Sequence, residues 1–466
     1  MTTFGRELSV RATPIPGLLV IDLPVHGDSR GWFKENWQRE KLTALGVPDL
    51  GPVQNNISFN DEIGTTRGIH AEPWDKFISV ATGRVFGAWV DLREGDTFGT
   101  VFTTEITPDV AIYVSRGIGN SYQSLEADTS YTYLVNDHWS PDASYTFLNL
   151  ADETVAIDWP IPLAECELSD KDRTHPRLAD VVPFAPRRTL VVGAHGQLGT
   201  ALQRELAGQD QVEFTDADTL DLTQDLSTAR PWTQYDTIIN AAAYTAVDRA
   251  ETPEGRAAAW KVNVEAVANL ARVATRYRLT LVHVSTDYVF DGSQELHTED
   301  EPLSPLGVYG QTKAAGDVVA STVPRHYVLR TSWVIGEGNN FVRTMASLAE
   351  RGIDPTVVDD QHGRLTFTED LAAAVSHLLA ERPAYGTYNV TNSGDVVSWA
   401  AIAKRVYELT GHDPARVTPV STATYYASAE GPIAPRPTHS ALDLAKIRAT
   451  GFEPRDADEA LQQYLA

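Results

Sequence analysis

The hydrophobic pattern of the chain changes near residue 185. Residues 1–170 carry short runs rich in Val, Ile, Phe, Tyr and Trp, such as KFISVATGRVFGAWVDL and DVAIYVSRG. Gly, Asp and Pro interrupt these runs at short intervals, and no long helical pattern lies between them. Many short strands in succession predict an all-β domain, a sandwich or small barrel of jelly-roll (cupin-like) type.

From Thr189 onward, strand-like and helix-like segments alternate. TLVVGAHG, DTIINAAA and LTLVHVS are apolar runs, whereas GTALQRELA and GRAAAWKVNVEAVANLARVATRY have helical periodicity. This alternation predicts an α/β domain with a Rossmann-type, doubly wound parallel sheet, followed by a smaller C-terminal substrate-binding part. The segment THPRLADVVPFAPRR has three prolines and no period, so we expect a linker there and domains over 1–185 and 187–466.

Composition and charge exclude several classes of protein. A hydrophobic share of 42% with 22% charged residues is typical of a globular chain. A net charge of -25 argues against a nucleic-acid partner. A single cysteine, no apolar N-terminal run and no stretch of 18 apolar residues predict a cytoplasmic protein without a membrane span.

A glycine pattern marks a candidate dinucleotide site. Gly193, Gly196 and Gly199 follow an apolar strand and open an amphipathic helix, where small residues allow a pyrophosphate to approach the helix N-terminus. The alternative is a tight turn that binds nothing. Asp216 lies at the separation expected for a ribose-binding carboxylate, which favours NADH, although its neighbours in TDADTLD are equally consistent with solvated carboxylates.

Tyr309 and Lys313 are four residues apart, so on a helix they share a face. An ammonium near a phenol is expected to lower the phenol pKa and help it release a proton. Thr286 ends the strand LVHVST and is placed to polarise a carbonyl. The spacing alone is common and usually structural, but after a glycine loop it favours acid catalysis of ketone reduction with a nicotinamide.

Five segments of the second half resemble the dTDP-4-dehydrorhamnose reductase family of extended short-chain dehydrogenases: GAHGQLG, NAAAYTAVDRAE, STDYVFDG, SPLGVYGQTKAAGD and RTSWVIGEGNNFVRTM. The resemblance covers nearly all of residues 187–466 and implies Thr286, Tyr309 and Lys313 as the catalytic set. It places a sugar nucleotide near Arg330, Trp333 and Arg436. The cofactor, NADPH or NADH, is expected at Gly193, Gly196, Gln197, Leu198, Gly199, Asp216, Asp221, Leu222, Ala241, Ala242, Ala243, Tyr309 and Lys313. A divalent ion such as Mg²⁺ stays an open question for this reductase, and the loop GRLTF departs from the family pattern and is left unassigned.

The β half carries HGDSRGWFKENW, QNNISF, TRGIHAEPWDKF, YTYLVNDHW and ELSDKD. Arginine and lysine among aromatic residues could hold a diphosphate and a base, although surface arginines are usually only solvated. His70 is a candidate base, and Asp172 is a carboxylate able to orient it. A lone histidine is more often structural.

Together these motifs resemble the dTDP-4-dehydrorhamnose 3,5-epimerase family, a cupin-type jelly roll, over about residues 8–180. The resemblance implies His70 as the base, Asp172 behind it, and Tyr133 as the acid on the opposite face of the sugar. It needs no metal. Substrate contacts are expected at Arg30, Glu35, Gln54, Asn56, Arg67, Lys76 and Asn120.

Two positions depart from the epimerase pattern. Asn120, in GNSY, stands where many members carry the histidine of an AHGF motif, and Trp139 stands where a tyrosine is usual. The segment IHAEPWDK between His70 and Lys76 is also short. We interpret these differences as marks of a subtype.

The two resemblances together imply one bifunctional enzyme of dTDP-L-rhamnose biosynthesis. It would epimerise the carbons beside the 4-ketone of a dTDP-sugar and then reduce that ketone, and a homodimer is expected from the epimerase half. Two alternatives remain at this point: an active reductase with a catalytically dead, nucleotide-binding cupin, and a regulatory binding protein.

Overall fold

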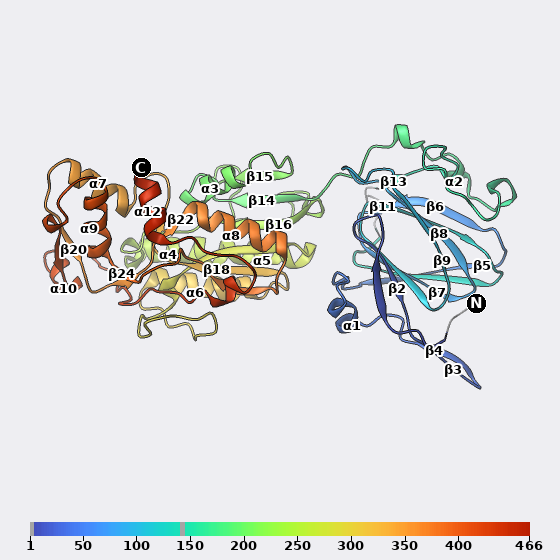
Figure 1. Ribbon diagram of the computed structural model, residues 1–466, viewed down its shortest axis with the longest axis horizontal. Coiled ribbons are helices and arrows are strands. Elements are labelled where there is room, and N and C mark those ends of the chain that lie inside the picture. The colour runs from blue at the N-terminus through green and yellow to red at the C-terminus, as the bar shows by residue number, and fades with distance from the viewer. Residues whose placement is uncertain (1–3, 140–144) are drawn as a thin grey trace. The chain divides into compact units, whose positions relative to one another are not determined.

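The computed structural model describes residues 4–139 and 145–466, and the chain divides into two compact units between Pro186 and Arg187. The first unit is built from antiparallel strands and the second around a parallel sheet (Figure 1). The expected division into an all-β half and an α/β half is therefore confirmed. Phe184, inside the predicted linker, packs on the first unit: it is buried, pairs with Arg93 and donates its backbone N–H to the carbonyl of Leu92.

Two sheets form the first unit. The larger has the order β1-β2-β10-β7-β12-β5 and the smaller the order β13-β6-β11-β8-β9. The strands of the larger sheet are β1 (Ser9–Ala12), β2 (Leu18–Asp22), β10 (Val110–Val114), β7 (Lys76–Thr82), β12 (Thr129–Val135) and β5 (Gln54–Asn60). Those of the smaller sheet are β13 (Thr146–Phe147), β6 (Thr66–Ala71), β11 (Ile118–Ser124), β8 (Val85–Asp91) and β9 (Val101–Ile106).

A common core lies between these two sheets. Ile78 and Val80 come from β7, Trp89 from β8 and Tyr122 from β11, and all four belong to one buried cluster. Because successive strand residues point to opposite faces, the alternating apolar residues of each strand can meet those of the facing sheet. A separate hairpin, β3 (Val25–Asp28) with β4 (Gly31–Lys34), and two short helices, α1 (Arg39–Ala44) and α2 (Asp170–Arg173), complete this unit.

The second unit contains a six-stranded sheet in the order β15-β14-β16-β17-β18-β23, and every neighbouring pair is parallel. In chain order this sheet begins with β14. The next strand, β15, lies on one side of β14 and the following strand, β16, lies on the other, so the direction in which strands are added reverses at β14. In open α/β sheets such a reversal creates the crevice in which ligands bind. The strands are β14 (Arg188–Val192), β15 (Val212–Thr215), β16 (Tyr235–Asn240), β17 (Thr280–Thr286), β18 (His326–Thr331) and β23 (Gly386–Asn389).

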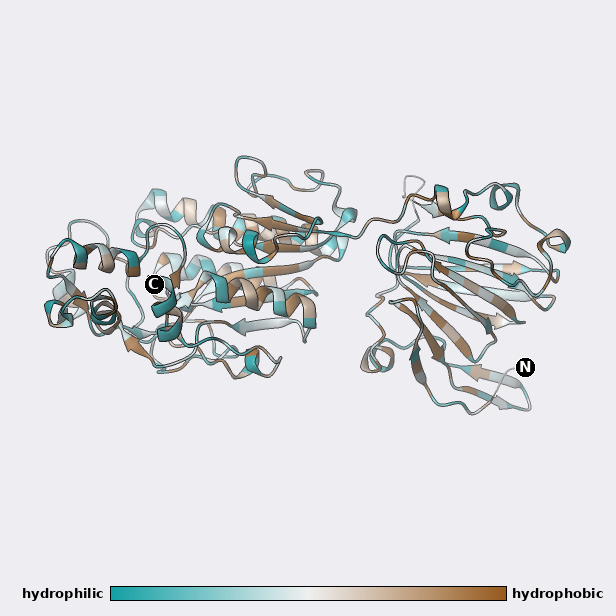
Figure 2. Ribbon diagram, turned by 45° about the horizontal axis from the view of Figure 1, so that its top comes forward, coloured by the Kyte–Doolittle hydropathy of each residue, from teal (hydrophilic) through white to brown (hydrophobic). Residues whose placement is uncertain are grey.

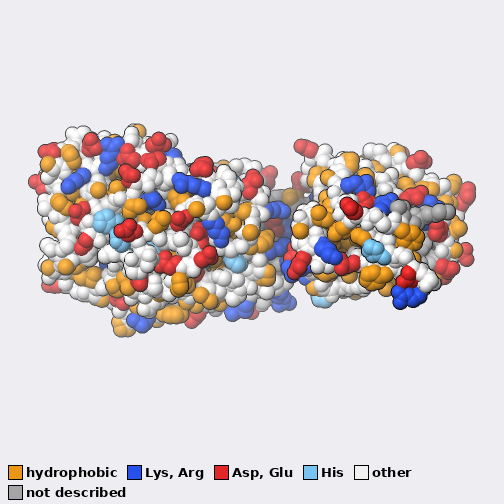
Figure 3. All heavy atoms as spheres, turned by 60° about the horizontal axis from the view of Figure 1, so that its bottom comes forward, with side chains coloured by type: hydrophobic (Ala, Val, Ile, Leu, Met, Phe, Trp, Pro, Cys, Tyr) orange, Lys and Arg blue, Asp and Glu red, His pale blue; other side chains and the backbone are white. Residues whose placement is uncertain are grey.

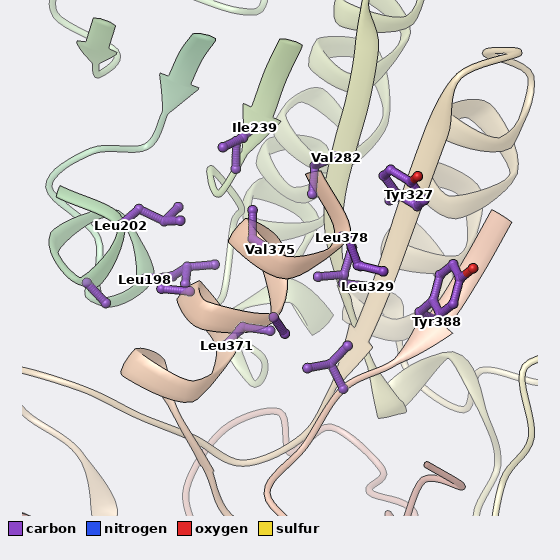
Figure 4. Packing of buried hydrophobic residues seen from close by; sticks show 14 of the residues in the cluster. Leu198, Leu202, Ile239, Val282, Tyr327, Leu329, Leu371, Val375, Leu378 and Tyr388 are labelled. Carbon is purple, nitrogen blue, oxygen red and sulfur yellow. The ribbon is translucent and has the colours of Figure 1, made fainter. Parts of the chain in front are cut away.

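Helices cover both faces of this sheet. On one face, Leu371, Val375 and Leu378 of α8 (Thr368–Glu381) lie between residues of α3 (Gln197–Glu205) and the strand residues Ile239, Val282 and Leu329 (Figure 4). On the other face, residues of α5 (Ala266–Tyr277) pack on strand residues such as Leu190 and Ile238. Burial on both faces explains why these strands read as continuous apolar runs.

The long helical segment expected after Gly255 is interrupted by a π-helical turn. It runs as α4 (Pro253–Trp260), a π segment at Lys261–Glu265 and then α5. The Asn263 side chain in the π segment donates to Oγ1 of Thr312 and to the backbone carbonyl of Tyr244. Thr312 lies in α6 (Val308–Ser321), so the turn fixes α6 against this segment.

A smaller C-terminal part has its own core of residues from α7 (Phe341–Glu350), α9 (Trp399–Leu409) and α12 (Ala457–Leu465). The remaining elements are β19 (Val334–Ile335), β20 (Thr356–Val358), β21 (His362–Gly363), β22 (Thr366–Phe367), β24 (Val397–Ser398), β25 (Thr418–Val420), α10 (Thr422–Tyr425) and α11 (Ala445–Arg448).

Hydrophobic segments concentrate on the strands of both units, while the loops are mostly polar (Figure 2). On the face shown in Figure 3, acidic and basic side chains are interspersed. Within the described residues, no helix is long and apolar enough to cross a membrane.

Candidate active sites

The first unit holds a cavity of about 1310 Å³ whose wall includes residues of both sheets. His70 lies on β6 of the smaller sheet, and Lys76 and Tyr133 lie on β7 and β12 of the larger one. Among the residues predicted from sequence, Arg67, His70, Lys76, Asn120, Tyr133 and Asp172 line this cavity.

His70 and Asp172 form a hydrogen-bonded pair at the cavity wall. His70 Nε2 lies 2.9 Å from Oδ1 of Asp172, and the Asp172 side chain is only 7% exposed. Burial raises the pKa of Asp172, but the hydrogen bond and charge of His70 outweigh it, so the pKa lies below its usual value. An ionised carboxylate only accepts, so Nε2 carries the hydrogen and Nδ1 is left as the basic nitrogen. The arrangement suits a general base.

Asp172 is held in place by its own helix. It lies in α2, whose N-cap residue Ser169 accepts a hydrogen bond from the Asp172 backbone N–H. Since a capped helix start has a defined geometry, the carboxylate is directed at His70 rather than left to rotate freely.

Lys76 and Tyr133 form the opposite wall. Lys76 is buried, pairs with the carboxylate of Glu72, and its Nζ lies 5.2 Å from the centre of the Tyr133 ring. Burial and the negative charge of Glu72 raise the pKa of Tyr133. The phenol therefore keeps its proton at neutral pH, and a cation lies beside it.

Four residues predicted to contact the substrate do not line the cavity. Arg30 is 87% exposed and pairs with Asp28 in the β3-β4 hairpin, and Glu35 pairs with Lys41. Gln54 and Asn56, on β5, hydrogen bond to each other. The structure therefore does not bring Arg30 or Glu35 to the cavity of their own chain.

The two departures from the family pattern lie at the cavity. Asn120 pairs with His70 across β11 and β6, and its Oδ1 accepts from the hydroxyl of buried Tyr131. Trp139 is 61% exposed and donates its backbone N–H to Gln54.

His175 is a site residue that sequence reasoning missed. Its Nε2 lies 3.9 Å from Oδ1 of Asp172, and its ring stacks on Phe147 and meets His70 edge-on at 5.3 Å. Burial and the charge of His70 lower its pKa. The three-residue spacing from Asp172 in DRTH was the available signal, because residues three apart adjoin on one side of a helical turn.

In the second unit, the loop from Gly193 to Gly196 joins β14 to α3. Gly193 has φ +80°, and a Cβ there would lie 2.7 Å from the backbone nitrogen of Ala242. A Cβ on Gly199 would lie 2.1 Å from the carbonyl oxygen of Gly193, so both positions require glycine. A Cβ on Gly196 would lie 3.3 Å from the carbonyl oxygen of Gly193, so a side chain there would be crowded at the helix N-terminus. These residues fit a pyrophosphate.

The other predicted cofactor residues differ in their surroundings. Asp216 accepts the backbone N–H groups of His195 and Ala217, and these bonds lower its pKa. Asp221 is exposed and accepts from Thr223. The side chains of Leu198 and Leu222 pack into the two cores, so they can meet a cofactor only through the backbone. Gln197 begins α3, and Ala241, Ala242 and Ala243 follow β16.

Thr286, Tyr309 and Lys313 meet where β17 ends and α6 begins. Thr286 ends β17, and Tyr309 hydrogen bonds with it. Lys313 donates from Nζ to the carbonyl oxygen of Val284, 2.7 Å away on the same strand. A Cβ on Gly310 would lie 2.2 Å from the carbonyl of Tyr288, so this glycine allows α6 to approach the strand end closely.

The pKa values in this site differ from the sequence expectation. Burial raises the pKa of Tyr309, and the charge of Asp287 raises it further, whereas the hydrogen bond with Thr286 lowers it. The expected lowering of the phenol pKa by Lys313 is therefore not what the structure shows. Burial lowers the pKa of Lys313 itself to about 8.

Three residues predicted near the sugar nucleotide have well-defined partners. Arg330 is buried and pairs with Asp317 at 3.1 Å, behind Lys313. The Trp333 ring stacks on Trp399 with centroids 3.8 Å apart. Arg436 pairs with Asp248 at 2.8 Å and lies over Tyr426.

Comparisons with known proteins match both units. A family model described as dTDP-4-dehydrorhamnose 3,5-epimerase matches residues 12–180, and one described as RmlD substrate binding domain matches residues 187–466. The Streptococcus pyogenes "Protein RmlC homolog" is 50% identical over 40% of this chain and 98% of its own length. A dTDP-4-dehydrorhamnose reductase from Aggregatibacter actinomycetemcomitans is 38% identical over 60% of this chain and 98% of its own length.

A solved structure agrees for the second unit. The dTDP-4-dehydrorhamnose reductase of Bacillus anthracis, in complex with NADP, has 32% identity and a TM-score of 0.54, covering 60% of this chain and 98% of that chain. With both units matched, the chain belongs to the dTDP-4-dehydrorhamnose 3,5-epimerase family in its first unit and to the RmlD substrate binding domain family in its second.

Proposed function

We propose that this chain is a bifunctional enzyme of dTDP-L-rhamnose biosynthesis. The first unit epimerises dTDP-4-dehydro-6-deoxy-D-glucose at carbons 3 and 5, and the second reduces the resulting dTDP-4-dehydro-L-rhamnose to dTDP-L-rhamnose. The observation that carries the proposal is the presence of two complete acid-base sets, His70 with Asp172 and Thr286 with Tyr309 and Lys313, in units of two families whose reactions are consecutive.

In the epimerase site, His70 removes a proton from a carbon next to the ketone. A neutral imidazole suffices because the negative charge that develops on the ketone oxygen is stabilised by a nearby cation, and Lys76 fills that role. Asp172 keeps His70 oriented and stabilises the imidazolium that forms. Tyr133, whose pKa is raised, returns a proton from the opposite wall of the cavity.

In the reductase site, the nicotinamide, when bound, supplies the hydride. Tyr309 then gives its proton to the ketone oxygen, and Thr286 holds that oxygen through its hydroxyl. The positive charge of Lys313 stabilises the phenolate left on Tyr309. The Gly193 to Gly199 segment holds the pyrophosphate at the N-terminus of α3.

For the cofactor we propose NADPH or NADH. The NADP-bound relative supports NADPH, and the Asp216 carboxylate, fixed by two backbone N–H groups, suits the ribose 2′-hydroxyl of NADH. Among the described residues of the second unit there is no group of three His, Cys, Asp or Glu ligands, and this proposal includes no metal ion there.

The proposal also includes the fold type of each unit. We assign residues 1–185 to a cupin-type jelly roll and residues 187–466 to a Rossmann-type doubly wound domain with a smaller C-terminal substrate-binding part. We further propose a homodimer. The exposed aromatic residues Trp32 and Phe33 on the β3-β4 hairpin, and the position of Arg30 and Glu35 away from the cavity of their own chain, support a contact through this hairpin.

The test is to incubate the full chain with dTDP-4-dehydro-6-deoxy-D-glucose in D₂O, with and without NADPH or NADH. Without cofactor, we expect deuterium to enter the sugar at two carbons. With cofactor, the product should be dTDP-L-rhamnose. Absence of deuterium, with reduction still observed when dTDP-4-dehydro-L-rhamnose is supplied, would indicate an active reductase with a catalytically dead cupin. Absence of both reactions even with that ketone supplied would indicate a regulatory binding protein.

A further inference from the structure

The cavity of the first unit contains a cluster of three possible metal ligands, of which the proposed acid-base chemistry uses two. His70, Asp172 and His175 each present one ligand atom, and these atoms all lie within 4.8 Å of one another. Asp172 lies between the two imidazoles, with Oδ1 at 2.9 Å from Nε2 of His70 and 3.9 Å from Nε2 of His175. The proposed reaction uses His70 and Asp172 and gives His175 no role.

The spacing of these atoms fits a transition-metal ion. Zn²⁺ binds imidazole nitrogen and carboxylate oxygen at about 2.0–2.2 Å, so in a tetrahedral site the ligand atoms lie roughly 3.4 Å apart. The observed separations bracket that value, and small side-chain rotations would close the set. Two histidines and one carboxylate also occur as the three protein ligands of zinc sites that keep an open fourth position.

Burial of the cluster favours such a site. The side chains of Asp172 and His175 are 7% and 10% exposed, whereas His70 is 34% exposed and borders the cavity. The ion would thus be held from behind by two buried ligands and reached from the cavity. The ring of His175 is fixed by stacking on Phe147 at 4.7 Å, which holds its Nε2 near Asp172. A ligand oriented in advance favours metal binding.

We propose that His70, Asp172 and His175 bind one divalent transition ion, Zn²⁺ or an ion of similar chemistry, and that the bound ion inhibits the first unit. The ion binds Nε2 of His70, where the hydrogen shared with Asp172 now lies, so the neutral imidazole carries its hydrogen on Nδ1 instead. Nδ1 then has no free electron pair to act as the base. Binding does not depend on the function proposed above, but inhibition does. The second unit, whose site uses Thr286, Tyr309 and Lys313, is unaffected.

Binding is tested on the untagged full chain with Co²⁺, whose visible absorption reports coordination, and by competition with Zn²⁺. We expect one ion per chain. His175→Gln and His175→Phe should each weaken binding by more than about 10-fold, since loss of a ligand costs at least as much as loss of a partner behind one. His175→Phe keeps a ring on Phe147, so it separates coordination from packing, and His26→Gln, an exposed histidine of the same unit, should leave affinity unchanged.

Each result of these experiments either supports or overturns part of the proposal. No binding at one ion per chain, or equal affinity of the parent chain and a folded His175 variant, overturns the site. If His175→Phe does not show the parent's unfolding transition, His175→Gln carries the comparison. Inhibition is measured separately with saturating Zn²⁺, as deuterium incorporation from the unepimerised ketone and as NADPH oxidation with the epimerised ketone supplied. Continued deuterium incorporation with the ion bound overturns inhibition alone, whereas a metal-free chain without deuterium incorporation contradicts the proposed function instead.

Discussion

Arg330 and Asp317 form an ion pair at 3.1 Å in which the two side chains are 7% and 3% exposed. Asp317 lies four residues after Lys313 on α6, and Arg330 also donates to the backbone carbonyl of Glu299. The pair is therefore buried behind the catalytic helix. It gives Arg330 a supporting contact with the catalytic helix, while the substrate contact implied by the resemblance stays a prediction.

Arg330→Met should lower the free energy of unfolding by about 3–5 kcal/mol, because it leaves the Asp317 carboxylate buried without its partner. Denaturant unfolding of the second unit measures this effect. Arg330→Lys, which keeps the charge, should lose less. A variant with parental stability but a higher KM for the sugar nucleotide would instead make Arg330 a substrate contact.

Tyr309→Phe should abolish NAD(P)H consumption and spare deuterium exchange, while His70→Ala should do the reverse when the epimerised ketone is supplied. The loss expected for a general acid or base is about 100- to 10,000-fold in rate. The two assays on one preparation serve as controls for each other. Loss of both activities in either variant would contradict separate sites.

The rate of reduction should depend on pH through Lys313. Its pKa is lowered to about 8, so the ammonium is present below that pH and is lost as the pH rises through it. We expect kcat/KM for the epimerised ketone to fall above about pH 8, and well above that pH it should fall about tenfold for each pH unit. Measured from pH 6 to 10, a flat profile would show that Lys313 keeps its charge.

Because the pKa of Lys313 in the folded chain is below that in the unfolded chain, this group also makes folding more favourable as pH rises from about 8 toward 10.5.

Asp216→Ser should shift the cofactor preference toward NADPH. The variant loses a charged acceptor for a ribose hydroxyl and the repulsion of a 2′-phosphate, so the ratio of kcat/KM values for NADPH and NADH should rise about 10-fold or more. Asp225→Ser, at an exposed carboxylate nearby in sequence that is not among the expected cofactor contacts, is the matched control. An unchanged ratio for Asp216→Ser would leave that carboxylate with only a structural role.

Phe33→Glu should shift the chain from dimer to monomer. Phe33 is 69% exposed on the hairpin, and a charge there would have to be desolvated in the contact. Sedimentation analysis measures the change. Val182→Glu, at a more exposed apolar residue of the same unit, should leave the oligomeric state as it is. A parental chain that is already monomeric would reject the homodimer.

Short strands in succession in the first half and strands alternating with helices in the second were sufficient to predict both sheet types, because burial of a sheet on one or two faces leaves its period in the sequence. The π turn at Lys261–Glu265 was not predictable, since its cause is a distant contact of Asn263 with Thr312. Tyr309, Lys313 and Thr286 could be grouped from motifs, yet the raised pKa of Tyr309 depends on burial that no motif records.

The same limit applies to the β half. His70 and Asp172 are 102 residues apart, and their contact was anticipated only through a resemblance. His175 was overlooked because it lies in THPRLADVVPFAPRR, which was interpreted as a linker, and its role emerges only when α2 is folded against β6. Arg30 and Glu35 were grouped with the site by motif, but Arg30 lies on a surface hairpin, and Glu35 follows that hairpin and pairs with Lys41 of α1.

His70 belongs to one sheet of the first unit, and Tyr133 belongs to the other. If the proposed roles hold, a sugar ring between the layers loses hydrogen toward one sheet and regains it from the other. The configuration of each epimerised carbon is then set by the architecture, because the base and the acid come from two β-layers about 10 Å apart and act on opposite faces of the ring. A substitution that lets the layers slide, far from either side chain, should therefore release a mixture of epimers.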